Sequence, residues 1–127
     1  MYRATTHGIQ VDVEPAYIPE KSQPMQALFF FSYRIQITNQ TEENVQLLSR
    51  QWIITDGAGA VREVKGEGVI GEQPKIAPGQ TYEYSSFCPL PTPTGNMRGS
   101  FMIKSANGEF YKVAVPLFFL RDMNSIQ

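Results

Sequence analysis

The stretch Ala27-Leu-Phe-Phe-Phe-Ser-Tyr-Arg-Ile-Gln-Ile-Thr-Asn39 is the strongest structural signal in this chain. From Phe29 to Ile37 every second residue is apolar, and from Ser32 onward the residues between them are polar. Side chains of a strand point alternately to its two faces, so this pattern predicts a long strand with one face in a core. Shorter runs with strand-like alternation lie on both sides of it, at 9–13, 45–56, 61–65, 81–87, 97–103 and 110–115.

Turn signals separate these runs, and no run has the period of an amphipathic helix. Asp56-Gly-Ala-Gly59 and Asn107-Gly108 are typical of hairpins. Pro116 predicts that 116–120 is an edge strand, because proline cannot donate a ladder hydrogen bond. The pattern predicts an all-β protein, an immunoglobulin/fibronectin type III-like β-sandwich, with a closed barrel as the alternative. The missing Cys…Trp…Cys pattern favours the fibronectin type III branch.

Length and composition limit the function classes. The 127 residues suit a single domain over 1–127, and 42% hydrophobic with 18% charged residues is a globular composition. Eleven Lys and Arg against 12 Asp and Glu leave a net charge of −1, which argues against a nucleic-acid partner. No apolar run reaches the ~20 residues of a membrane span, and none resembles a signal peptide. We therefore expect a cytoplasmic protein with no membrane partner, either a monomer or a homodimer.

Histidine and cysteine are too scarce for the common catalytic and metal sites. His7 and Cys88 are the single residues of their kinds, whereas a zinc site needs several such ligands at short spacing. Catalysis by a Ser-His-Asp or Cys-His set would have to use His7, for which a solvated terminal position is the favoured interpretation. We expect Cys88 to be a structural thiol, since no neighbouring cation in the sequence would lower its pKa. The residues thus predict no catalytic residue, metal or cofactor, and no enzyme.

A glycine motif, Gly66-Glu-Gly68-Val-Ile-Gly71, matches the dinucleotide-binding pattern but not its context. Pro74 would break a helix begun there, so a cofactor fold is disfavoured. The favoured interpretation is a tight crossing between sheets. In the alternative, the backbone amides form an anion site. That site would draw charge-assisted contacts from three basic side chains, Arg50, Arg62 and Lys65.

Trp52, in Gln46-Leu-Leu-Ser-Arg-Gln-Trp52, also has two interpretations. A tryptophan in a β-sandwich is most often a core residue. As the alternative, tryptophan and arginine are frequent anchors of protein interfaces, which makes Trp52 an interface candidate.

Several segments together resemble the ApaG family (DUF525), along nearly the whole chain. The combination of Val-Gln-Leu-Leu-x-Arg-x-Trp with Gly-x-Gly-Val-x-Gly-x-Gln-Pro is specific, whereas either half alone is weak. The similar segments are Gly8-Ile-Gln-Val11, Tyr33-Arg-Ile-Gln-Ile-Thr-Asn39, Val45-Gln-Leu-Leu-Ser-Arg-Gln-Trp52, Gly66-Glu-Gly-Val-Ile-Gly-Glu-Gln-Pro74, Ile76-Ala-Pro-Gly79 and Gly95-Asn-Met-Arg-Gly99.

The resemblance implies a fibronectin type III-like sandwich in a bacterial cytoplasmic protein, often encoded beside a diadenosine-tetraphosphate hydrolase. It also implies an association with cobalt resistance and magnesium efflux, without an agreed molecular activity. Similar domains in a eukaryotic F-box protein and a polymerase-delta-interacting protein look like protein-interaction modules. Carried over by position, the suggested phosphate-binding motif is Gly66, Gly68 and Gly71.

Together these observations predict a non-enzymatic binding or adaptor domain for an unidentified protein partner. Any effect on cobalt or magnesium transport would be indirect, because no membrane span and no metal-ligand cluster is visible in the sequence. The alternative is a sensor in which the glycine-rich loop binds a phosphate-containing small molecule, such as pyrophosphate or a nucleotide.

Overall fold

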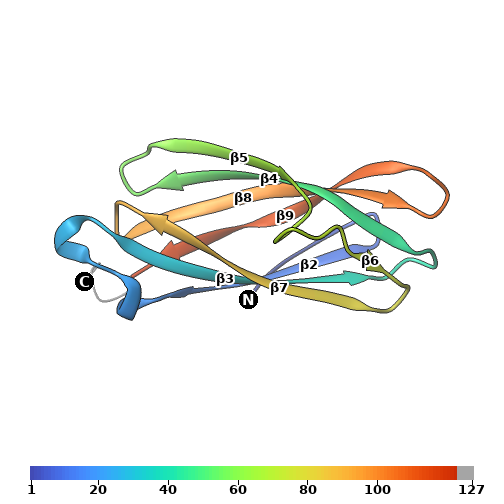
Figure 1. The fold of residues 1–127 in the computed structure, drawn as a ribbon, viewed down its shortest axis with the longest axis horizontal. Coiled ribbons are helices and arrows are strands. Elements are labelled where there is room, and N and C mark those ends of the chain that lie inside the picture. The colour runs from blue at the N-terminus through green and yellow to red at the C-terminus, as the bar shows by residue number, and fades with distance from the viewer. Residues whose placement is uncertain (123–127) are drawn as a thin grey trace.

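Two antiparallel sheets pack face to face in the computed structural model, which describes residues 1–122 (Figure 1). The predicted β-sandwich is confirmed. Residues 123–127, the end of the range predicted for the domain, lie outside the described residues. Within 1–122, no helix has the length and apolar character needed to cross a membrane.

The four-stranded sheet has the order β1-β2-β3-β7, and the other sheet has the order β5-β4-β8-β9, with the short β6 added to β4. In Figure 1 the first sheet is the lower layer and the second the upper one. Two 3₁₀ turns, η1 (Pro19–Lys21) and η2 (Pro24–Gln26), connect β2 to β3. The strands are β1 (Tyr2–Thr6), β2 (Ile9–Tyr17), β3 (Phe29–Asn39), β4 (Val45–Asp56), β5 (Val61–Glu67), β6 (Lys75–Ile76), β7 (Thr81–Leu90), β8 (Thr94–Ser105) and β9 (Phe110–Arg121).

Strand β3 follows the predicted alternation over its whole length. Its odd-numbered residues from Phe29 to Asn39 are buried, and the even-numbered ones are more exposed. The strand lies between β2 and β7, so both of its edges are hydrogen-bonded. This central position explains why its pattern is the clearest in the sequence.

Strands β1 and β2 differ from the prediction. β1 was not predicted, because Tyr2-Arg-Ala-Thr-Thr6 has little apolar content and its inward residues are only half-buried. β2 extends beyond the predicted run 9–13 and continues through Pro15 to Tyr17. The pairing with β1 stops at Val13, so Pro15 lies where one edge of β2 has no partner strand and needs no donor on that side.

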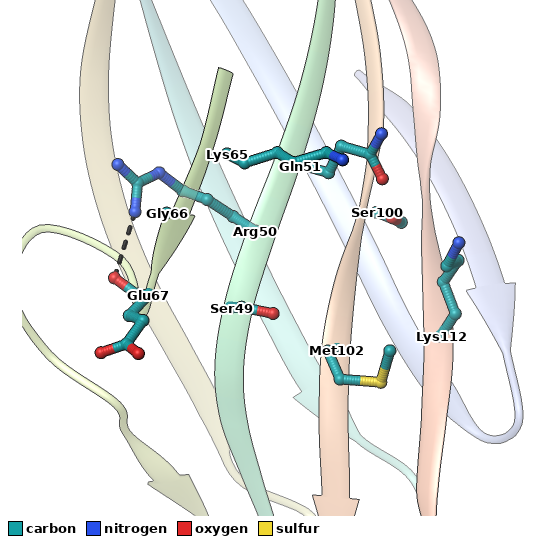
Figure 2. Close-up of a pocket in the computed structure, with 9 residues that line it drawn as sticks. All are labelled: Ser49, Arg50, Gln51, Lys65, Gly66, Glu67, Ser100, Met102 and Lys112. Atoms are coloured by element: carbon teal, nitrogen blue, oxygen red, sulfur yellow. Dashed lines mark hydrogen bonds between the residues drawn. The ribbon is translucent and has the colours of Figure 1, made fainter. Parts of the chain in front are cut away.

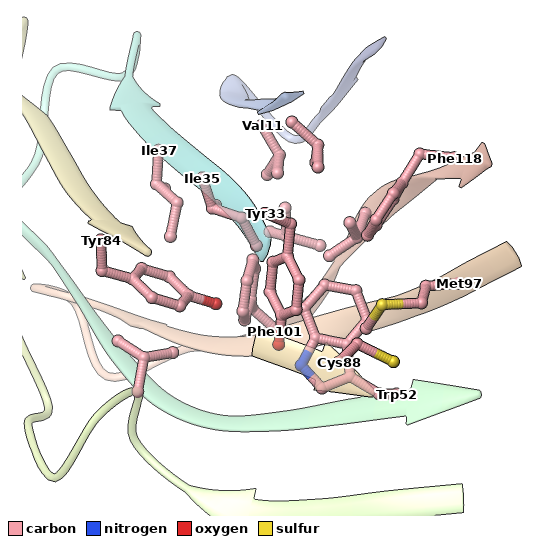
Figure 3. Packing of buried hydrophobic residues seen from close by; sticks show 14 of the residues in the cluster. Val11, Tyr33, Ile35, Ile37, Trp52, Tyr84, Cys88, Met97, Phe101 and Phe118 are labelled. Carbon is pink, nitrogen blue, oxygen red and sulfur yellow. The ribbon is translucent and has the colours of Figure 1, made fainter. Parts of the chain in front are cut away.

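The core lies between the sheets and is rich in aromatic side chains (Figure 3). Trp52 packs at close to right angles against Phe101 and Phe118, and its ring centroid is 5.4 Å from that of Tyr33. Such edge-to-face pairs stabilise beyond the area they bury. Cys88 and Met97 fill the space beside the indole in Figure 3.

The two sides of the sandwich differ. On one side β1 and β2 pack against β9, and the Ala114 amide donates to Thr6 Oγ1 at 3.2 Å. On the other side β5 and β7 are the edge strands. There the Arg62 guanidinium reaches from β5 to β7 and donates to the Pro89 carbonyl at 3.1 Å. The glycine motif begins at the end of β5, on this second side.

Candidate functional site

The outer face of the β5-β4-β8-β9 sheet carries a shallow trough, of which Figure 2 shows one end. It consists of two hollows of about 360 Å³ and 610 Å³ that share three lining residues, Gln51, Ser100 and Lys112. The first hollow extends toward β5, and the second extends along β9 to Leu117. The trough therefore crosses four neighbouring strands.

Strand pairing explains why these residues meet. Gln51 of β4 lies opposite Lys65 of β5 on one side and Ser100 of β8 on the other. Ser100 in turn lies opposite Ala114 of β9. Residues directly opposite each other share a face, so these four form one row across the sheet. The short side chains of Ser100 and Ala114 in this row create the depression.

A β-bulge in β4 sets which side chains face the trough. The register of β4 with β8 shifts between Leu47 and Ser49, which adds a residue to β4. As a result Leu47 and Trp52 are both buried although one is odd-numbered and the other even-numbered. Ser49 and Gln51 are thereby turned to the outer face, and Arg50 is turned to the inner one.

The trough holds several donors that are free within the described residues. The ammonium of Lys112, the guanidinium of Arg98 and the hydroxyls of Ser49 and Ser100 form no hydrogen bond or ion pair in residues 1–122. Arg98 and Lys112 are exposed at the second hollow. Free cations and hydroxyls on one face are suited to an anionic or acceptor-rich ligand.

The β5 rim of the trough is electrically balanced instead. Lys65 Nζ lies 3.3 Å from Glu63, and Gln51 Nε2 donates to the same carboxylate at 3.0 Å. The hydrogen bond from Gln51 and the nearby ammonium lower the pKa of Glu63, so its charge is favoured. The free positive charge therefore lies toward β8 and β9.

Arg50 lines the first hollow at its β5 end, but its guanidinium is engaged by the glycine loop. Its guanidinium donates to the carbonyls of Glu67 at 3.2 Å and Gly68 at 3.0 Å, and Figure 2 shows the first contact as a dashed line. A side chain at Gly66 would lie within 2.7–3.0 Å of this guanidinium, so glycine leaves the space that Arg50 occupies.

The glycine loop itself closes as a two-residue turn. Val69 and Glu72 exchange backbone hydrogen bonds of 2.8 and 3.0 Å, and Ile70 and Gly71 between them have φ of 49° and 76°. The Gly68 amide donates to the Leu48 carbonyl at 2.7 Å. The amides of residues 68, 69 and 72 are thus already paired with carbonyls, which leaves fewer donors for an anion.

The structure brings together only part of the predicted anion site. Arg50 lies at the glycine loop, but Arg62 contacts Pro89 and Cys88 on β7, and Lys65 points to the outer face toward Glu63. Anion binding by Gly66, Gly68 and Gly71 stays a prediction, with Arg50 as its one adjacent cation among the three proposed.

For Trp52 the core interpretation describes the structure. Its side chain is 3% exposed and is enclosed by aromatic rings, so the alternative of an interface anchor is corrected: a buried indole offers no surface to a partner.

Two other groups are buried rather than poised for chemistry. Cys88 is 2% exposed, and burial raises the pKa of its thiol while the contact with Arg62 lowers it. Tyr84 is 8% exposed, and burial raises the pKa of its hydroxyl strongly.

His7 lies at the turn between β1 and β2, with its ring centroid 5.0 Å from that of Tyr111. Within residues 1–122, no three His, Cys, Asp or Glu side chains gather as a metal site would require.

The sequence reasoning missed the trough residues Ser49, Arg98, Ser100 and Lys112. For Arg98, Ser100 and Lys112 the alternation of β8 and β9 indicates outward positions, whereas the bulge in β4 hides the outward position of Ser49. What could not be deduced was that β4, β8 and β9 are neighbours in one sheet.

Comparisons with known proteins agree on one family. The model of the ApaG domain matches residues 19–105. Proteins named ApaG from a Bradyrhizobium species and from Mesorhizobium japonicum are 53% and 49% identical over 120 residues, which cover 94% of this chain and 92% of each relative.

Solved structures show the same similarity. The crystal structure of the putative ApaA protein from Bordetella pertussis has a TM-score of 0.88 and 45% identity, over 95% of this chain and 97% of that one. The C-terminal domain of wzt, at 13% identity and a TM-score of 0.54, shares the fold alone.

Proposed function

Because this chain belongs to the ApaG family, for which no molecular role is specified, we propose from its geometry that it is a non-enzymatic binding domain. Its partner is held on the outer face of the β5-β4-β8-β9 sheet. The observation that carries this proposal is the trough of free donors on a rigid sheet. Binding surfaces on rigid elements are pre-organised, so little conformational entropy is lost when a partner docks.

The buried chemistry supports binding rather than catalysis. The Cys88 thiol and the Tyr84 hydroxyl are both in the core, and their pKa values are raised, so neither group is a ready nucleophile. Free serine hydroxyls line the trough, but within the described residues no histidine lies beside them to act as a base. An effect on cobalt or magnesium transport would then pass through the bound partner.

The second candidate is a phosphate, pyrophosphate or nucleotide sensor at the glycine loop. The position of Arg50 favours it, since this guanidinium already lies against the loop. Against it, the loop pairs three of its own amides, and both Glu67 and Glu72 bring negative charge. We therefore place the binding surface on the sheet face.

Photo-crosslinking tests the proposed face in the cells that make the protein. A photoreactive amino acid replaces Ser100 in the trough or, as a matched control, Ser85 on the outer face of the other sheet. We expect an adduct from position 100 that is lost when unlabelled protein is in excess, and none from position 85. No adduct at position 100, or equal adducts from both positions, would contradict the proposal.

A further inference from the structure

We propose that the trough binds an extended acidic segment of a partner protein, whose carboxylates pair with Arg98 and Lys112. This inference rests on the proposed binding function and specifies the ligand. Its basis is the spacing, the charge and the surroundings of the two free cations.

The spacing of the cations favours an extended ligand. Lys112 of β9 lies opposite Met102 of β8, and Arg98 is four residues from Met102 along β8. At about 3.3 Å per residue this is about 13 Å along the strand direction. A ligand that meets both cations with their side chains extended outward must carry charges a similar distance apart. Two carboxylates four residues apart on one face of an extended segment have the same separation.

The surroundings favour a protein segment over a nucleic acid. Proteins that bind single strands stack bases on aromatic side chains in a basic groove, whereas among residues 1–122 no aromatic side chain lines either hollow. The net charge of the chain is −1, so the long-range attraction that nucleic-acid binding uses is missing.

The side chains beside Arg98 specify the neighbour of one acidic residue. Ile53 of β4 lies opposite Arg98, and Leu117, which is 48% exposed, lines the same hollow. These apolar side chains lie at the Arg98 end of the hollow, so they are suited to an apolar residue next to the carboxylate that pairs with Arg98, on the same face of the segment. The balanced β5 rim, with Glu63 and Glu67, would repel further acidic residues and so keep them near β8 and β9.

A peptide titration followed by amide NMR tests the inference. The probe is Glu-Ser-Leu-Ser-Glu-Ser, which places two carboxylates and one leucine on the same face. We expect shifts for amides near Arg98, Ser100 and Lys112, weakened by added salt. The same peptide with both Glu replaced by Gln is the control and is expected to cause no shifts.

Variants locate the contact. Arg98→Gln and Lys112→Gln are each expected to weaken peptide binding about fivefold, the upper range for a single exposed ion pair. Lys104→Gln is the matched control, because Lys104 lies on β8 but contacts the Phe110 ring and does not line the trough. All three positions are exposed, and the spectrum of each variant shows whether it is folded.

The outcomes separate this inference from the proposed function. It is overturned if the Gln peptide binds equally well, if inorganic phosphate produces the same shifts, or if a uridine oligonucleotide displaces the peptide. If the Glu peptide fails while the adduct at position 100 still forms, the acidic ligand is excluded and the binding face is retained. If both fail, both proposals are excluded.

Discussion

The Tyr84 hydroxyl is buried, and within the described residues it has no hydrogen-bond partner. Tyr33 stands beside it in the core, and the neighbouring Ser86 hydroxyl favours its ionised form, which lowers its pKa against the effect of burial. An unpaired polar group in a core costs free energy, whereas a paired one does not. The two tyrosines therefore form a natural comparison.

We expect Tyr84→Phe to raise the free energy of unfolding by about 1 kcal/mol. The change removes a hydroxyl that loses its contact with water on folding and forms no hydrogen bond in return. Tyr33→Phe, the control, is expected to lower it by about 1 kcal/mol, since the Tyr33 hydroxyl, unlike that of Tyr84, is not among the buried polar atoms without a partner and its polar interaction is lost. Urea denaturation measures both. Equal destabilisation by the two changes would show that the Tyr84 hydroxyl is bonded in solution.

The single thiol should be protected in the folded protein. Cys88 is buried, and its raised pKa keeps it protonated near neutral pH. We expect no reaction of native protein with Ellman's reagent at pH 8, and one thiol per chain after unfolding in urea. Rapid reaction before unfolding would mean that β7 opens to solvent.

At the scale of elements, the glycine motif is explained by the turn it forms. Gly68 has φ of 63°, and a Cβ there would lie 2.1 Å from the Glu72 carbonyl oxygen. Gly71 has φ of 76°, but a Cβ there would have no atom within 4 Å. A side chain at Gly68 is therefore disfavoured by both the backbone conformation and a close contact. A side chain at Gly71 is disfavoured by the backbone conformation alone.

This difference predicts unequal effects of alanine. Gly71→Ala should cost about 1 kcal/mol for the left-handed backbone. Gly68→Ala should cost at least about 3 kcal/mol, because the turn must also move away from the new methyl group. Thermal or urea unfolding measures both changes. Equal costs would contradict the close packing of Gly68 on Glu72.

The strands were predictable in proportion to their burial. β3 was found almost completely, because both of its edges are paired and its alternation is unbroken. β1 was missed because its inward side chains are half-buried, and β4 changes parity at its bulge, which the period alone cannot locate. Predicting the trough also requires the order of the strands in the sheet, and this order depends on contacts between segments that are distant in the sequence.

At the scale of the whole molecule, the burial of one thiol and two tyrosine hydroxyls makes the free energy of unfolding decrease at high pH. Burial raises the pKa of Cys88 above its ordinary value of 9.0 and the pKa of Tyr33 and Tyr84 above 10.0. Above these values the unfolded chain releases protons that the folded protein keeps. The contribution is therefore full below pH 9 and is lost progressively as the pH rises.

We expect the urea midpoint to be nearly constant between pH 7 and 9 and to fall between pH 10 and 11. Each buried tyrosine contributes about 1.4 kcal/mol per pH unit above its ordinary pKa. Tyr84→Phe should reduce the slope, which separates tyrosine ionisation from the titration of lysines. A midpoint unchanged up to pH 11 would contradict burial of these hydroxyls.

The contact between Thr6 and Ala114 has a consequence for how the protein is made. These residues are 108 positions apart, and nearby the rings of Tyr2 and Phe118 have centroids 6.2 Å apart. During synthesis β1 leaves the ribosome long before β9. The apolar faces of the early strands therefore stay exposed until the last strand has been made. Chaperones that shield nascent chains should therefore matter more to the yield of this protein than its small size suggests.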